Sequence, residues 1–128
     1  MSAKSDYLEN AVLDHVLGTS ALSSPSAYLS LYTSNPGETD SGTELSGNGY
    51  ARLAVSFGSA SSGSATGPTA AKEFTASGAS WGTVTHFGVH DALTSGNLLY
   101  YGALTASKTI ADGDTLRFAA NSITVTEA

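Results

Sequence analysis

Residues 81–125 read WGTVTHFGVHDALTSGNLLYYGALTASKTIADGDTLRFAANSITV, and this stretch decides the fold of the chain. It contains four runs rich in β-branched, aromatic and aliphatic residues, which predict strands at about 82–90, 97–104, 115–119 and 122–126. Turn signals separate the runs: TSGN at 94–97 closes the first pair of strands, DGD at 112–114 closes the second, and AAN at 119–121 offers a third bend. An Asp-Gly pair is a strong hairpin signal. Because no helical pattern lies between these strands, the sequence argues against a parallel α/β sheet.

Upstream residues extend the β pattern. Residues 27–32 alternate as a strand with bulk on both faces, and residues 50–57 form the most regular alternation of the chain. Phe74 anchors a further short strand. About seven short strands with frequent turns predict a mainly β protein, a single antiparallel β-sandwich or small barrel. The Gly/Ser-rich segment at about 58–72 is expected to be a surface loop, as is 34–49.

One amphipathic helix is predicted at about residues 6–17. Ser5 is a suitable N-cap and Gly18 a suitable left-handed stop. One helix face carries a largely apolar stripe at positions i, i+3, i+4, i+7 and i+8, formed by Leu8, Ala11, Val12, His15 and Val16. Such a stripe must be buried, either against the sheet of the same chain or against a neighbouring subunit.

Composition limits the classes of function. A chain of 128 residues is expected to form one domain, 1–128, and can build a core without metals or disulfides. The net charge is −6, and the five basic residues are scattered, so the sequence predicts no direct nucleic-acid partner and no anionic membrane partner. The absence of cysteine excludes disulfides and thiolate zinc sites. No segment resembles a signal peptide or a membrane helix, so we expect no Sec export.

The sequence offers no convincing catalytic or metal-binding set. His86 and His90 lie four residues apart in a strand, which separates them by about 13 Å unless the chain bends at Gly88. Asp112 and Asp114 lack the remaining ligands of a calcium loop and fit a turn better. The chain has no serine nucleophile elbow. We therefore expect a non-enzymatic protein with no cofactor and no metal.

Apolar and aromatic residues are the better candidates for function. Tyr100 and Tyr101 are neighbours in a strand, so one ring should enter the core while the other reaches a face. Trp81 begins a strand and is either an interface anchor or a plug at the end of the sandwich. The candidate interface residues are Leu8, Val12, Val16, Trp81, Tyr100 and Tyr101.

Four segments together resemble a family of small virion proteins of tailed bacteriophages. They are YLENAVLDHVLG near the start, GNGYARLAVSF, SWGTVTHFGVHDA and GNLLYYGALTASKTIADGDTLRF, and they span almost the whole chain in order. Members of this family are labelled tail fibre or minor structural protein. The resemblance implies a virion structural protein, assembled in the cytoplasm of the bacterial host, and no enzymatic activity.

The position within the virion is not fixed by this resemblance. The chain lacks the extended repeats or heptads of a long fibre, and a sandwich with one helix suits a subunit that docks on a lattice. We therefore expect a homo-oligomeric capsid decoration (cement) protein that cross-bridges neighbouring subunits of the major capsid protein. The alternatives are a structural protein associated with the tail or fibre, partnered by tail proteins, and a glycan-binding β-sandwich. A small hydrolase is a further alternative that no motif supports.

Overall fold

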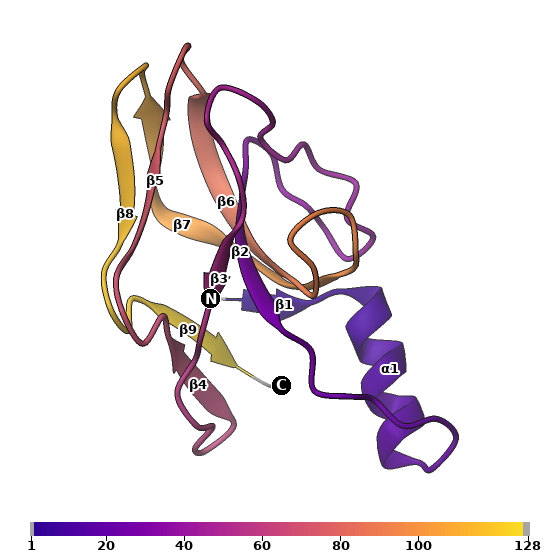
Figure 1. The fold of residues 1–128 in the computed structure, drawn as a ribbon. Helices are drawn as coiled ribbons and strands as arrows, with labels where there is room; N and C mark the ends of the chain where they lie inside the picture. The colour runs from indigo at the N-terminus through magenta and orange to yellow at the C-terminus, as the bar shows by residue number, and fades with distance from the viewer. Residues whose placement is uncertain (1, 127–128) are drawn as a thin grey trace.

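The largest sheet contains five antiparallel strands in the order β1-β7-β6-β2-β3 (Figure 1). The computed structural model describes residues 2–126. The sheet pairs the long strand β7 with β6 along most of the length of β6, and β6 with β2. Its strands are β1 (Ser2–Lys4), β2 (Ala27–Tyr32), β3 (Leu53–Val55), β6 (Gly82–His90) and β7 (Leu98–Ile110).

Two smaller sheets of two antiparallel strands each complete the β structure. The first pairs β4 (Ser64–Gly67) with β9 (Ile123–Thr126), and the second pairs β5 (Lys72–Thr75) with β8 (Thr115–Phe118). Within the described residues the fold is mainly β, with 41% strand and 9% helix and with no closed barrel. The β-sandwich expected from the sequence is therefore confirmed, and the barrel alternative is not.

The core lies between the five-stranded sheet and the smaller sheets. Leu29 and Leu31 of β2 alternate with polar neighbours and are completely buried. Phe74 and Phe118 face them from β5 and β8, with ring centroids 6.1 Å apart and nearly perpendicular planes. This edge-to-face arrangement of aromatic rings adds stabilisation beyond the buried area. Trp81 closes the core at one end, where its indole Nε1 donates a hydrogen bond to a loop carbonyl.

The turn after β6 forms the predicted hairpin. Ser95 and Gly96 have φ angles of 55° and 70°, as tight turns require. The prediction of a hairpin at Asp112–Asp114 is wrong, because β8 pairs with β5 and not with β7. The turn does form, with Gly113 at φ 88°. Hydrogen bonds between its backbone and Ala76 tie it to the end of β5, which directs β8 into the smaller sheet.

Strand β7 extends to Ile110, six residues beyond the predicted end at 104. The register with β6 shifts between the pairs Val84↔Lys108 and His86↔Ala103, so residues 104–107 of β7 lie opposite Thr85 alone. Such a bulge bends the strand and redirects its side chains. At the bulge, β7 departs from its regular pairing with β6, and this part of β7 lies next to strands β8 and β9.

Several short strands differ from the predictions. The predicted strand 50–57 is reduced to Leu53–Val55, because Tyr50 packs its ring against Trp81 and Phe74 instead of continuing the ladder. The segment 58–72, expected to be a loop, contains β4. Strand β1 was not predicted, since three residues are too few to show a periodic pattern.

The single helix in the described part of the chain, α1, spans Asp6–Val16 and agrees with the prediction to within one residue. Ser5 caps it: its Oγ accepts a hydrogen bond from the Leu8 amide and donates one to the carbonyl of Leu98. Of the apolar stripe only Leu8 is buried, with 5% of the residue exposed, whereas Val16 is 71% exposed. The helix runs past the edge of the sheet and projects from the body of the protein (Figure 1). Among residues 2–126, no helix is both long enough and apolar enough to cross a membrane.

Candidate functional site

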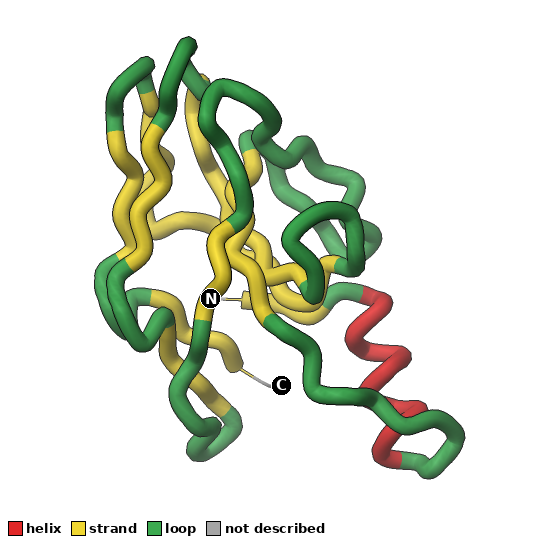
Figure 2. The backbone as a smooth tube through the Cα atoms, in the orientation of Figure 1, coloured by secondary structure: helices red, strands yellow, loops and turns green. Residues whose placement is uncertain are grey.

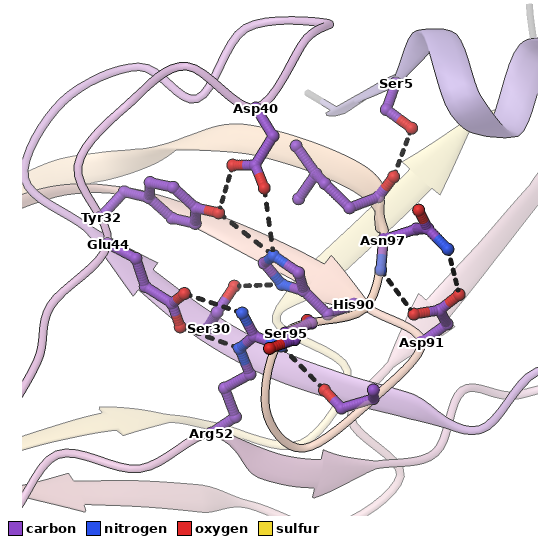
Figure 3. A network of polar contacts seen from close by, with 12 residues as sticks. Ser5, Ser30, Tyr32, Asp40, Glu44, Arg52, His90, Asp91, Ser95 and Asn97 are labelled. Carbon is purple, nitrogen blue, oxygen red and sulfur yellow. Dashed lines mark hydrogen bonds and ion pairs between the residues drawn. The ribbon is translucent and has the colours of Figure 1, made fainter.

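A network of polar side chains, buried at Ser30, Tyr32 and His90 and open to solvent at Asp40, lies on the five-stranded sheet (Figure 3). Ser30 and Tyr32 share one face of β2 because they alternate along this strand with the core residues Leu29 and Leu31. His90 joins them from the neighbouring strand β6. The loop 34–49 folds over these side chains. We call the following set the polar network: Ser30, Tyr32, Asp40, Glu44, Tyr50, Arg52 and His90.

His90 is fully buried, and both of its ring nitrogens have partners. Its Nδ1 lies 2.9 Å from the Ser30 hydroxyl, and its Nε2 lies 3.2 Å from the Tyr32 hydroxyl. The Tyr32 hydroxyl donates to Asp40 at 2.6 Å. Burial lowers the pKa of His90 and the charge of Arg52 lowers it further, while Glu44 and Asp40 act in the opposite direction. The net shift is downward, which favours the neutral imidazole.

Arg52 and Glu44 form the second half of the network. The guanidinium contacts the carboxylate through two hydrogen bonds of 2.9 and 2.8 Å, a bidentate geometry that is stronger than a single contact. The Tyr50 hydroxyl donates to the same carboxylate at 2.6 Å. Although burial alone would raise the pKa of Glu44, the hydrogen bonds from Arg52 and Tyr50 and the Arg52 charge lower it overall. The carboxylate is therefore held in its charged form.

Arg52 also connects two loops. Its Nη1 donates to the carbonyls of Ala92 and Ser95 at 2.9 and 2.7 Å, in the turn between β6 and β7. Asp91 holds the other end of that turn by accepting from the Asn97 backbone amide and side chain. The guanidinium thus joins the loop 34–49, through Glu44, to the β6–β7 turn.

The combination of Ser30, His90 and Asp40 invites comparison with a hydrolytic triad, but its geometry is unsuitable. A nucleophilic serine must be reachable by substrate, whereas Ser30 and His90 are both 0% exposed. The closest Asp40 oxygen lies 3.7 Å from the same Nε2 that contacts Tyr32. Within the described residues every buried side-chain nitrogen and oxygen has a hydrogen-bond partner. We conclude that the network fixes loops on the sheet.

Three acidic residues gather at the N-terminus of α1. Ligand oxygens of Asp6, Glu9 and Glu38 lie within 4.8 Å of one another. A hydrogen bond with Glu9 and the charges of Glu9 and Asp6 raise the pKa of Glu38. Negative side chains are common at helix N-termini, where the helix dipole favours them. This arrangement therefore has an ordinary structural explanation.

The six candidate interface residues do not form one surface. Leu8 and Trp81 are buried within the chain, so little of either side chain can reach a partner. Tyr100 packs against the core, and Tyr101 lies on the opposite face, where burial and then the charges of Glu38, Glu9 and Asp6 raise its pKa. The two rings therefore face opposite ways, as predicted. Val12 is half-buried and Val16 is exposed, and a contact role for the six residues stays a prediction.

The sequence reasoning missed the most exposed apolar surface. We define the helical arm as residues 12–26, the second half of α1 and the loop that returns to β2 (Figure 2). Its tip exposes Leu13, Val16 and Leu17 by 57%, 71% and 74%. These residues lie at i, i+3 and i+4 and share one face. The arm is braced internally, since the Leu22 amide donates to His15 Nδ1 at 3.0 Å. Leu13 and Leu17 were missed because they lie off the stripe that begins at Leu8.

A groove opens on another side of the molecule, where the bulge of β7 lies next to β8 and β9. We call it the β7–β9 groove. Its volume is about 350 Å³. Phe87, Leu116, Phe118 and Ile123 belong to the core and line it, so the groove reaches the hydrophobic interior. Lys108 and Arg117 stand among its polar residues.

Comparison with known proteins gives one family. The sequence model of the family described as "Podophage GP4 fiber I protein gp80" matches residues 3–126. A comparison with curated proteins found no match. The family match confirms the resemblance to phage virion structural proteins, and it names a fibre rather than a capsid component.

Proposed function

Because this chain belongs to the family of the podophage GP4 fiber I protein gp80, we propose that it is a fibre-associated structural subunit of a podophage tail. The observation that carries this proposal is the family match over residues 3–126, nearly the whole chain. Membership in a phage virion family implies association with other virion proteins. We propose tail proteins as the partners.

We further propose that the protein acts through contacts and not through catalysis. The polar network supports this view, because its serine and histidine are buried and its polar atoms are already paired. The helical arm also supports a role in protein contacts. Leu13, Val16 and Leu17 expose apolar side chains on a projecting element, and exposed apolar patches commonly mark sites of protein contact.

The capsid decoration role expected from the sequence is not confirmed. The family description names a fibre, which favours the alternative of a protein associated with the tail or fibre. The glycan-binding alternative predicts an exposed aromatic platform. Among the large apolar and aromatic side chains of residues 2–126, only one aromatic, Tyr7 at 42% exposure, is exposed. A single exposed ring gives this alternative little support.

Particles assembled without the protein provide the test. If it belongs to the fibre, such particles should lack fibre density and adsorb poorly, while their capsids resist heating as well as those of the parent phage. Supplying the wild-type chain from a plasmid should restore adsorption. Capsids that lose heat resistance while the fibres remain complete would refute the fibre role and support the capsid decoration hypothesis instead. Binding in a glycan array would instead indicate a receptor-binding module.

A further inference from the structure

We propose that the helical arm of one copy docks in the β7–β9 groove of a second copy. This inference rests on the proposed function, because it names another copy of the chain as a partner in the fibre-associated assembly. Its basis is an apolar tip without a cover, a groove that opens into the core, and charges of opposite sign beside the two.

The arm offers a surface that its own chain leaves uncovered. Three of the five large apolar side chains exposed among the described residues, Leu13, Val16 and Leu17, belong to the arm. Burying such side chains is favourable in proportion to the apolar area removed from water. The tip projects away from the sheet, so closing it requires another molecule (Figure 1).

The groove is suited to apolar side chains. Phe87, Leu116 and Ile123 are core residues that line it, so a side chain entering from outside would extend the existing core. The opening lies at the β7 bulge, where residues 104–107 have only Thr85 opposite them in β6. A volume of about 350 Å³ lies near the lower end of the range for ligand pockets, which fits a few aliphatic side chains better than a whole helix.

The charges beside the two surfaces are complementary. Asp14 lies on the arm near the C-terminal end of α1. The helix dipole disfavours a negative charge at this end, so the carboxylate is not stabilised electrostatically by its own helix. Neither Asp14 nor Lys108, beside the groove, forms an ion pair within residues 2–126. The chain carries a net charge of −6, so copies repel one another in most orientations. Lys108 places a positive charge beside the groove, whereas Arg117 is already paired with Glu73 at 3.5 Å.

The two surfaces lie on different sides of one molecule. The arm projects at the right of Figure 1, whereas β8, which borders the groove, lies at the left edge. An arm therefore enters the groove of a neighbour, and that neighbour keeps its own arm free for the next copy. A contact of this head-to-tail kind closes into a ring when the rotation permits and continues as a filament when it does not.

Sedimentation velocity of the purified chain over a range of concentrations tests the contact. The wild-type chain should associate reversibly as its concentration rises. Leu17→Asp should weaken association by roughly tenfold or more, because a carboxylate would have to enter an apolar groove. Leu93→Asp is the matched control, since Leu93 is 53% exposed on the β6–β7 turn, outside the arm, and it should associate like the wild type. Circular dichroism must show both variants folded.

A charge exchange tests the pairing of the two surfaces. Asp14→Lys and Lys108→Glu should each weaken association by about two- to fivefold at low salt, the usual worth of an exposed ion pair. An equal mixture of the two variants should recover wild-type association, because each arm then meets a groove of opposite charge. The double variant should recover it for the same reason.

Three results would overturn the inference. The first is a wild-type chain that stays monomeric at every concentration. The second is a folded Leu17→Asp chain that associates normally. The third is a mixture of the charge variants that stays as weak as either variant alone. A monomeric chain whose Leu17→Asp variant fails to enter virions would assign the arm to a different virion protein. Each of these three results would refute the docking of the arm without affecting the proposed location in the fibre. Conversely, a chain that self-associates as predicted but lies on the capsid would refute only the proposed function.

Discussion

His90 shows how one residue links burial, hydrogen bonding and pH. Its imidazole is enclosed by Ser30 and Tyr32, and the charged groups that face it are Asp40, Glu44 and Arg52. Its pKa in the folded state lies below the ordinary value of 6.5. Below pH 6.5 the histidine is therefore protonated more readily in the unfolded chain than in the folded chain. The free energy of unfolding consequently decreases as the pH falls.

We predict that the free energy of unfolding decreases as the pH falls below about 6.5, by at most about 1.4 kcal/mol per pH unit from His90. His90→Gln should lower stability at neutral pH but flatten this dependence, as measured by urea unfolding at several pH values. Glu44, whose pKa is lowered from 4.5, destabilises the fold only in a more acidic range. His86→Gln is the control, because His86 lies in the same strand, is only partly buried and should alter the slope less. An unchanged slope in His90→Gln would show that His90 titrates normally.

Gly88 is required by the close approach of three side chains. A Cβ at this position would lie 2.7 Å from Ser30 Oγ and 2.9 Å from Leu98 Cδ1. Gly88→Ala should therefore destabilise the fold by about 1–3 kcal/mol, the usual cost of overpacking. Gly58→Ala is the matched control, since a Cβ there would meet its nearest neighbour, the Thr66 carbonyl, at 3.6 Å. Thermal or urea unfolding checks both, and equal stabilities would contradict the packing described at Gly88.

The helix α1 divides into two parts with different roles. Leu8 is buried under the first turn and belongs to the core cluster, whereas Val16 projects into solvent at the tip of the arm. The sequence alone predicts one buried stripe that includes both residues. The difference arises because the helix projects beyond the body of the protein (Figure 1). Sequence periodicity carries no information on where a neighbouring element ends.

Aspartate substitutions separate these two parts. Leu8→Asp should destabilise the fold by about 3–5 kcal/mol, since a charge would be buried without a partner. Val16→Asp should change the free energy of unfolding by less than about 0.5 kcal/mol, as for most surface substitutions, while it reduces docking of the arm. Chemical denaturation measures the first effect and sedimentation velocity the second. If Val16→Asp unfolded the chain as Leu8→Asp does, the arm would not project as described.

Elements with strong local patterns were predictable from the sequence. Strand β6 and the helix were located almost to the residue, because alternation and capping are local signals. The end of β7 was not predictable from the sequence, because it depends on a bulge opposite Thr85 in the neighbouring strand β6. The pairing of β8 with β5 was missed for the same reason, because a turn at Gly113 does not specify the strand that receives its chain.

The polar network was invisible to sequence reasoning. Its histidine and serine lie 60 residues apart in the sequence, and neither lies in a motif. The network becomes visible only when β2 pairs with β6, which brings Ser30 opposite Gly88 and next to His90. The expectation of a non-enzymatic protein stays a prediction, which an activity assay would test.

The whole molecule combines a β-sandwich with one projecting arm. Hydrogen bonds of the polar network connect the loop 34–49 and the β6–β7 turn to the sheet. The arm leaves the body and exposes apolar residues, and the β7–β9 groove opens elsewhere on the surface. Two separate apolar surfaces suit a structural subunit, and the family match implies that the chain is part of a phage virion.

The location of the protein in an intact particle tests the central claim most directly. A cryo-EM reconstruction of the virion that includes the tail should be fitted with the sandwich and its projecting helix. We predict that the fold occupies density at the tail fibres, in the small number of copies set by the tail symmetry. Density for this fold on the outer surface of the capsid shell, in tens to hundreds of copies, would contradict the account.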